Sequence, residues 1–151
     1  MKGLIIIGFL FLFSTNQIFG QFLQEQEWAK LSNYISSNDQ IGFKTYLKNK
    51  GFLKANEPSE KYNFYTWNTT EKLIYAIRVN KKSGQVTYMT NDQNYVLKLL
   101  SRFMSDYTLV KSEKQSKSTT HIFQSLDGTI AVKLDTASDS GTHLLFAIID
   151  S

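Results

Sequence analysis

The sequence predicts an α+β fold in which helices pack on one face of an antiparallel sheet. Apolar residues recur at helical spacing in the segments that follow Leu23 and Asn91, and they alternate with polar residues between Glu71 and Val79, as in a strand. The triplet Asn38-Asp39-Gln40 also returns as Asn91-Asp92-Gln93. Because similarity at a fixed period indicates a structural repeat, we expect an N-terminal helix followed by a tandem α-β-β-β repeat.

The first helices are predicted from apolar spacing and from residues that favour helix ends. Apolar side chains at i, i+3 and i+7 from Trp28 indicate an amphipathic helix over residues 23–36. The triplet 38–40 supplies a turn and an N-cap, because Asn and Asp side chains accept hydrogen bonds from the free amides of a helix start. A second helix is expected to end near Lys50, with Gly51 as its C-terminal stop.

Two similar units are expected after the first helix, the first over about residues 38–90 and the second over about 91–151. The strands predicted for the first unit are 61–67, 71–79 and 85–90. The second unit is expected to have a helix along the stripe Val96 to Phe103 and strands at 119–125, 129–135 and 142–149. An antiparallel sheet covered by helices on one face leaves its other face open to a partner.

The N-terminus has the layout of an export signal. Lys2 precedes the unbroken apolar run Leu4 to Phe13, and a polar stretch then leads to Gly20 and Gln21. The run is too short for a permanent membrane span, which needs about 20 apolar residues. We therefore expect residues 1–20 to be a signal peptide, cleaved near Gly20-Gln21, and residues 21–151 to be a single soluble domain, secreted or periplasmic. The alternative is a buried N-terminal strand of a cytosolic protein.

Composition narrows the functional classes. The chain has no cysteine, so disulfides and thiolate metal sites are excluded, and the exported domain must be stable through packing alone. Its net charge is +4, with basic residues gathered in 44–82 and acidic residues in 118–151. The basic segment fits either an anionic partner or ordinary solvated lysines. With two arginines in an exported chain, nucleic acid is not the expected partner.

Catalytic and metal signatures are not found. The histidines His121 and His143 stand outside any zinc-binding spacing, and no G-x-S-x-G or phosphate-binding glycine loop is present. The stretch from Asp135 through Asp139 to Gly141 lacks the spacing of a calcium loop and reads as an acidic solvent loop. Asn68-Thr69-Thr70 matches a glycosylation acceptor, a triplet that is common by chance. We therefore expect no enzyme, no metal and no cofactor.

An aromatic cluster in the first unit is the candidate binding feature. Its members are Tyr62, Phe64, Tyr65, Trp67, Tyr75 and Tyr88. In a strand, Tyr62 and Phe64 point to one face and Tyr65 and Trp67 to the other, so one pair must lie away from the helices. We expect Tyr65 and Trp67 to anchor a partner, because exposed Tyr and Trp are effective interface anchors. Lys61 and Lys72 would form a basic rim; the alternative is that the cluster is core.

The function predicted from these features is an exported, non-enzymatic binding module that captures a protein, as an inhibitor or immunity protein does. The doubled helix-plus-sheet arrangement resembles β-lactamase inhibitory proteins, an analogy at the level of the fold that shares no motif. Two alternatives stay open. One is an envelope-associated protein that binds a glycan or lipid, and the other is a hydrolase with an unrecognised site.

Overall fold

The computed structural model describes residues 20–67, 72–138 and 140–148, and these form an α+β fold of three helices and one eight-stranded sheet. The first part of the chain forms α1 (Glu25–Ser36), α2 (Gln40–Asn49), β1 (Phe52–Lys54), β2 (Tyr62–Trp67), β3 (Tyr75–Asn80) and β4 (Val86–Thr90). The rest forms α3 (Gln93–Asp106), β5 (Thr108–Gln115), β6 (Ser118–Ser125), β7 (Gly128–Asp135) and β8 (His143–Ile148). The apolar leader segment, Asn68-Thr69-Thr70 and Asp139 lie outside the described residues.

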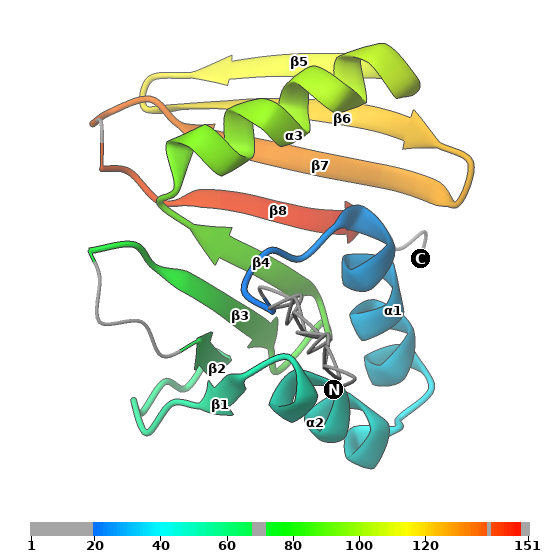
Figure 1. Ribbon diagram of the computed structural model, residues 1–151, viewed down its shortest axis with the longest axis vertical. Coiled ribbons are helices and arrows are strands. Elements are labelled where there is room, and N and C mark those ends of the chain that lie inside the picture. The colour runs from blue at the N-terminus through cyan, green and yellow to red at the C-terminus, as the bar shows by residue number, and fades with distance from the viewer. Residues whose placement is uncertain (1–19, 68–71, 139, 149–151) are drawn as a thin grey trace, which may run out of the picture.

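The sheet is antiparallel, with the strand order β1-β2-β3-β4-β8-β7-β6-β5. In each half, the strands follow chain order from an outer edge to the centre. The halves join where β4 pairs with β8, with Tyr88 opposite Leu145. Figure 1 shows β1 to β4 in the lower part of the molecule and β5 to β8 in the upper part, with α3 in front of the upper strands. One continuous sheet therefore connects the two halves.

Each half contains one strand more than the sequence predicts, namely the edge strands β1 and β5. The prediction of three strands per unit missed them because neither shows the alternation of a half-buried strand. β1 has only three residues, and β5 is exposed along nearly its whole length. Such strands are defined by hydrogen bonds to a single neighbour, and the pattern of apolar residues does not report those bonds.

The two N-caps predicted from the repeated triplet are confirmed. Asp39 caps α2 by accepting a hydrogen bond from the backbone N–H of Gly42 at 2.8 Å. Asp92 caps α3 in the same way, with the backbone N–H of Tyr95 at 3.0 Å. In both helices the carboxylate satisfies an amide three residues ahead, one of the amides that lack a partner within the helix. The helix that follows each triplet therefore starts where the local sequence dictates.

Each helix contributes an aromatic ring to the same face of the sheet. The contacts are Phe43 of α2 with Tyr65, Trp28 of α1 with Tyr88, and Phe103 of α3 with Phe123, at centroid distances of 5.4, 6.4 and 5.6 Å. The strand registers place those three sheet residues on one face. One hydrophobic cluster includes them all and extends across both halves. We call this the covered face.

Helix α1 connects the two halves through two acidic side chains. Glu25 is 4% exposed and accepts hydrogen bonds from Arg102 of α3 and from the hydroxyl of Tyr107, both at 2.6 Å. Burial alone would raise the pKa of Glu25, but these two partners outweigh it and the pKa is lowered. Glu27 is bound by Lys50 and Tyr46 at the end of α2. The helix that precedes the two units thus holds them together.

Candidate functional site

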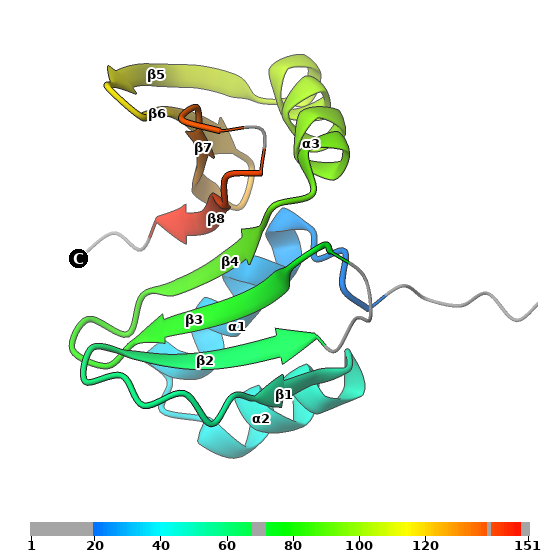
Figure 2. The same cartoon turned by 90° about the vertical axis from the view of Figure 1, so that its left-hand side faces the viewer.

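The second face of the sheet is the candidate site, and we call it the open face. Side chains that alternate along each strand with those of the covered face project from it. In the described part of the chain, the helix contacts given above all fall on the covered face, and Figure 2 shows β3 and β4 in front of α1, with α2 beside β1 at the bottom of the view. The main residues of the open face are Tyr62, Phe64, Arg78, Met89, Ile122, Ala131, Leu144 and Phe146.

An arginine between aromatic rings is the main polar feature of this face. Phe64 of β2 lies directly opposite Arg78 of β3. The Tyr62 and Phe64 rings are 5.9 Å apart between centroids, and the guanidinium carbon of Arg78 lies 4.8 Å from the Tyr62 centroid. Lys61 Nζ lies 5.2 Å from the same ring. Stacking of a guanidinium on an aromatic ring holds the cation in place while leaving its N–H groups available to an acceptor.

The Nε atom of Arg78 is buried and has no hydrogen-bond partner. A buried N–H without an acceptor costs free energy, and most such groups in folded proteins are paired with protein or water. No ion pair of Arg78 is found among the described residues. A carboxylate or another anionic acceptor from outside the chain would bind the terminal nitrogens of the guanidinium, and it would reach Nε only after the atoms that bury Nε move aside.

An apolar strip continues from this arginine across the central strands. Met89 of β4 faces Leu144 of β8, and Phe146 of β8 faces Ala131 of β7. Ala131 is only 1% exposed, because the larger side chains beside it shield it. The strip thus places large side chains beside the small side chain of Ala131. It crosses the junction between the two halves of the sheet. The Met89, Leu144 and Phe146 side chains are half-buried, so part of their apolar area meets solvent.

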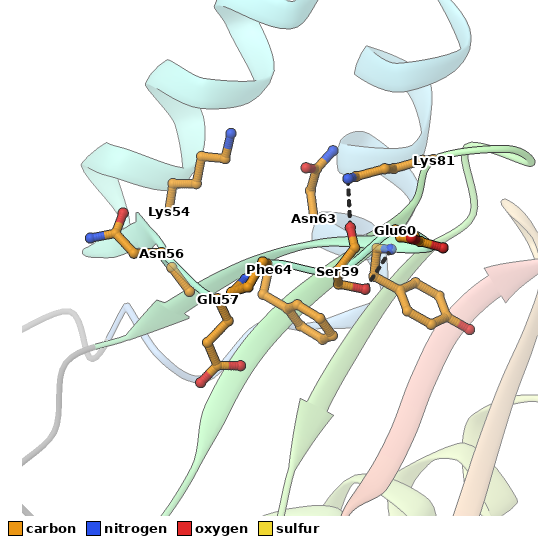
Figure 3. A pocket seen from close by; sticks show the side chains of 11 residues that line it. Lys54, Asn56, Glu57, Ser59, Glu60, Asn63, Phe64 and Lys81 are labelled. Atoms are coloured by element: carbon orange, nitrogen blue, oxygen red, sulfur yellow. Dashed lines mark hydrogen bonds between the residues drawn. The ribbon is translucent and has the colours of Figure 1, made fainter.

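A hollow of about 730 Å³ adjoins the aromatic end of the open face. It is formed by the connection between β1 and β2 and by the turn that holds Lys81, whose ammonium group donates to the carbonyl of Ser59 at 2.6 Å. Figure 3 shows the Phe64 ring and the Glu57 carboxylate on one side of β2, with Lys54 and Asn63 projecting from the other side. The hollow therefore combines one aromatic wall with charged and amide groups.

The structure separates the residues that the sequence grouped together. Tyr65 is 7% exposed and packs on Phe43, and Trp67 packs against the edge of the Tyr75 ring, so both lie on the covered face. The anchors expected from the sequence are therefore under the helices, because α2 covers that face of β2. Tyr62, Phe64 and Lys61 lie together at the open face, whereas Lys72 is exposed in the segment that precedes β3.

Two further aromatic residues of the sequence cluster belong to the core. The hydroxyl of Tyr88 donates to the carbonyl of Gln21 at 2.5 Å, and that of Tyr75 donates to Asp92 at 2.7 Å. Sequence reasoning did not select Arg78, although the alternation of Leu73, Tyr75, Ile77 and Val79 puts it on the opposite face. Only the pairing of β2 with β3 shows that Phe64 stands beside it.

The two histidines lie at separate places. His121 Nδ1 is 2.8 Å from the hydroxyl of Ser112, on two adjacent strands. His143 lines a hollow of about 320 Å³ beside α3, and its Nδ1 accepts the backbone N–H of Asp135 at 3.1 Å. Burial lowers the pKa of His143, and the nearby Asp135 charge opposes that effect. The Asp135 carboxylate instead accepts the backbone N–H of Ala137 at 2.7 Å, so these groups close a turn.

Comparisons with known proteins give no assignment: no protein-family model, no curated protein and no solved structure matches the chain. Within residues 20–67, 72–138 and 140–148, no three histidine or acidic residues gather closely enough to hold a metal ion. No helix in the same ranges is long and apolar enough to cross a membrane. The geometry of the open face is therefore the basis on which we infer the function.

Proposed function

We propose that the protein is an exported, non-enzymatic binding module that captures a partner protein on its open face. The export signal predicted for residues 1–20 supports a secreted or periplasmic site of action. The partner surface consists of Tyr62, Phe64 and Arg78 at one end and the apolar strip at the other. The role is that of an inhibitor or immunity protein, which acts by occupying a surface of its target.

The observation that carries this proposal is the buried, unpaired Nε of Arg78 beside two aromatic rings. Tyrosine and arginine are enriched among the residues that dominate binding energy at protein interfaces. An arginine can bind a carboxylate through two parallel hydrogen bonds, which adds geometric specificity. The partner therefore presents an acidic side chain to Arg78 and an apolar segment to the strip formed by Met89, Leu144 and Phe146.

Capture by matched variants tests the proposal. The exported domain is immobilised and exposed to envelope extract, and the captured protein is identified and then titrated in purified form. We expect Arg78→Ala and Phe64→Ala each to weaken binding roughly 30-fold, the size of a 2 kcal/mol hot spot. Lys44→Ala, which removes an exposed charge from α2 on the covered side, should leave binding unchanged. Equal capture by all three folded variants would contradict the proposal.

A glycan is the second candidate ligand, and the hollow beside Phe64 supports it. Its wall combines an aromatic ring with Asn56, Asn63 and Glu57, groups that can accept and donate hydrogen bonds to sugar hydroxyls. Titration of the exported domain with envelope oligosaccharides separates the two functions. Saturable binding that Asn56→Ala and Asn63→Ala weaken, with no effect of Arg78→Ala, would favour the glycan over the protein partner.

We infer that the two halves are copies of one helix-plus-sheet unit, over about 38–90 and 91–151. The matching caps at Asp39 and Asp92 and the shared strand order from edge to centre support this relation. The units differ at the open face, because the first carries the aromatic rings and arginine while the second carries Ile122, Ala131 and Lys133 at its corresponding strands. Divergence of the first unit from the second would account for the aromatic rings and the arginine at one end of the proposed binding surface.

A further inference from the structure

Gln21, near the start of the described residues, is packed into the folded domain. It is 7% exposed, its carbonyl accepts the hydroxyl of Tyr88, and its side-chain Oε1 is buried without a hydrogen-bond partner. Two residues later, Leu23 is fully buried, and its carbonyl accepts hydrogen bonds from Trp28 and Tyr95. The residues that follow the predicted cleavage site are therefore part of the core of the domain.

Cleavage after Gly20 would create a charge at this position. A free α-amino group has a pKa of about 7.7–8.0 and is mostly protonated at neutral pH. Burial of an ammonium group without an anionic partner costs several kcal/mol. The first acidic side chains along the chain, Glu25 and Glu27, are already bound by Arg102 and Lys50. Where the cleaved chain keeps Gln21 in the position that it has in the full-length chain, the new ammonium group is largely buried, and the first two acids that follow it along the chain are paired elsewhere.

We propose that Gln21 becomes the N-terminal residue of the exported protein and is cyclised to pyroglutamate. This inference rests on the proposed export and cleavage. The Gln21 α-nitrogen attacks Cδ of its own side-chain amide. The new N–Cδ bond closes a five-membered lactam, the Cδ–Nε2 bond breaks, and Nε2 leaves as ammonia with a proton from the α-nitrogen. Nothing is oxidised or reduced, and no co-reactant is consumed.

The product suits this position better than the open N-terminus does. The lactam nitrogen is neutral, so the cost of a buried ammonium disappears. Cyclisation removes the Nε2 group and moves the unpaired Oε1 into a ring, while the Gln21 carbonyl that accepts from Tyr88 is unchanged. The buried side chain of Leu23 and the hydrogen bonds to its carbonyl hold the segment that follows in the fold.

Mass spectrometry of the exported protein tests the modification. The full chain is expressed in a Gram-negative host, the protein is recovered outside the cytosol, and its N-terminal peptide is sequenced. We expect the peptide to begin at position 21 and to be lighter than its sequence by one ammonia molecule. Gln21→Asn is the matched control, because its corresponding ring would have only four atoms and would be too strained to form.

The possible results separate the modification from the export on which it rests. A peptide that begins at Gln21 with its full mass overturns the cyclisation while leaving the export intact. Retention of the whole chain in the cytosol, or a mature N-terminus elsewhere, overturns the cleavage and the modification together. Loss of ammonia from the Gln21→Asn protein would also overturn the assignment, because the loss would then come from another residue.

A second measurement tests the physical reason for the modification. Protease removal of a fusion partner exposes an uncyclised Gln21, and thermal unfolding of this form is compared with that of the cyclised form. An ammonium group that is buried without an anionic partner destabilises the fold while it is protonated and stops doing so once it loses its proton at high pH. We expect the cyclised form to unfold several degrees higher at about pH 6 and at the same temperature at about pH 10. Coincident curves at both pH values would contradict burial of the ammonium.

Discussion

The two faces of β2 have different tasks although they belong to the same six residues. Tyr65 and Trp67 point under α2 and contribute to the core, whereas Tyr62 and Phe64 point away and stand beside Arg78. All four side chains are aromatic, so residue type does not separate the two pairs. The difference is made by which face the helices cover. The covered face is therefore expected to control stability, and the open face to control binding.

Substitutions at two neighbouring residues of β2 test the comparison of its two faces, and they have the largest expected effect on the free energy of unfolding. Tyr65→Ala should lower the free energy of unfolding by about 3 kcal/mol, because it leaves a cavity under Phe43. Phe64→Ala should lower it by about 1 kcal/mol, because part of that ring already contacts solvent. Chemical denaturation of both variants measures the difference. A larger loss for Phe64→Ala than for Tyr65→Ala would reverse the assignment of the faces.

Two ion pairs allow a buried charge to be compared with an exposed one: Glu25 with Arg102, and Glu113 with Lys111. Arg102→Ala should lower the free energy of unfolding by about 2 kcal/mol, because it leaves the buried Glu25 without its cationic partner and with only the neutral side-chain donors Tyr107 and Gln26. Removal of the more exposed Lys111 from its pair with Glu113 should cost less than about 0.5 kcal/mol. Urea unfolding of both variants at low and high salt provides the test. A double Arg102→Ala and Glu25→Gln variant should regain part of the lost stability.

The helix caps allow the two halves to be compared directly. Asp39→Ala should cost about 1 kcal/mol through the lost hydrogen bond to Gly42. Asp92→Ala should cost more, because Asp92 also accepts the hydroxyl of Tyr75, which is then left without that acceptor. Thermal unfolding with Asn at each position serves as the control, since Asn retains a capping oxygen. Equal losses at the two sites would show that the hydrogen bond from Tyr75 adds nothing.

The smallest expected effect is a pH dependence at His143, whose pKa is lowered by burial. The fold favours the neutral ring, which accepts the backbone N–H of Asp135. Stability from this contact is complete above the ordinary pKa of 6.5 and is lost as the pH falls through the lower value in the folded protein. His143→Asn keeps an acceptor near Nδ1 without titrating. The wild type should therefore lose more stability than this variant between about pH 7 and pH 5.

Much of the local structure was predictable because it depends on short-range rules. The caps at Asp39 and Asp92 follow from side chains that satisfy helix amides, and the six central strands follow from alternation or from apolar runs between turns. The edge strands β1 and β5 were missed because their residues are mostly exposed and show no such pattern. The expectation that Tyr65 and Trp67 lie on the face away from the helices was wrong for a similar reason, since alternation divides a strand into two faces without saying which one a helix covers.

The α+β class, the positions of the helices and the absence of cysteine behind an apolar leader can be read from residue spacing and composition alone. These properties depend on patterns that act over a few residues. The pairing of β4 with β8 into one sheet, the place of Arg78 beside Tyr62 and Phe64, and the burial of Gln21 with its carbonyl bound by Tyr88 are visible only in the folded chain. Those relations join residues far apart in the chain. They depend on strand register and on the face that the helices cover, and neither is encoded in a local pattern.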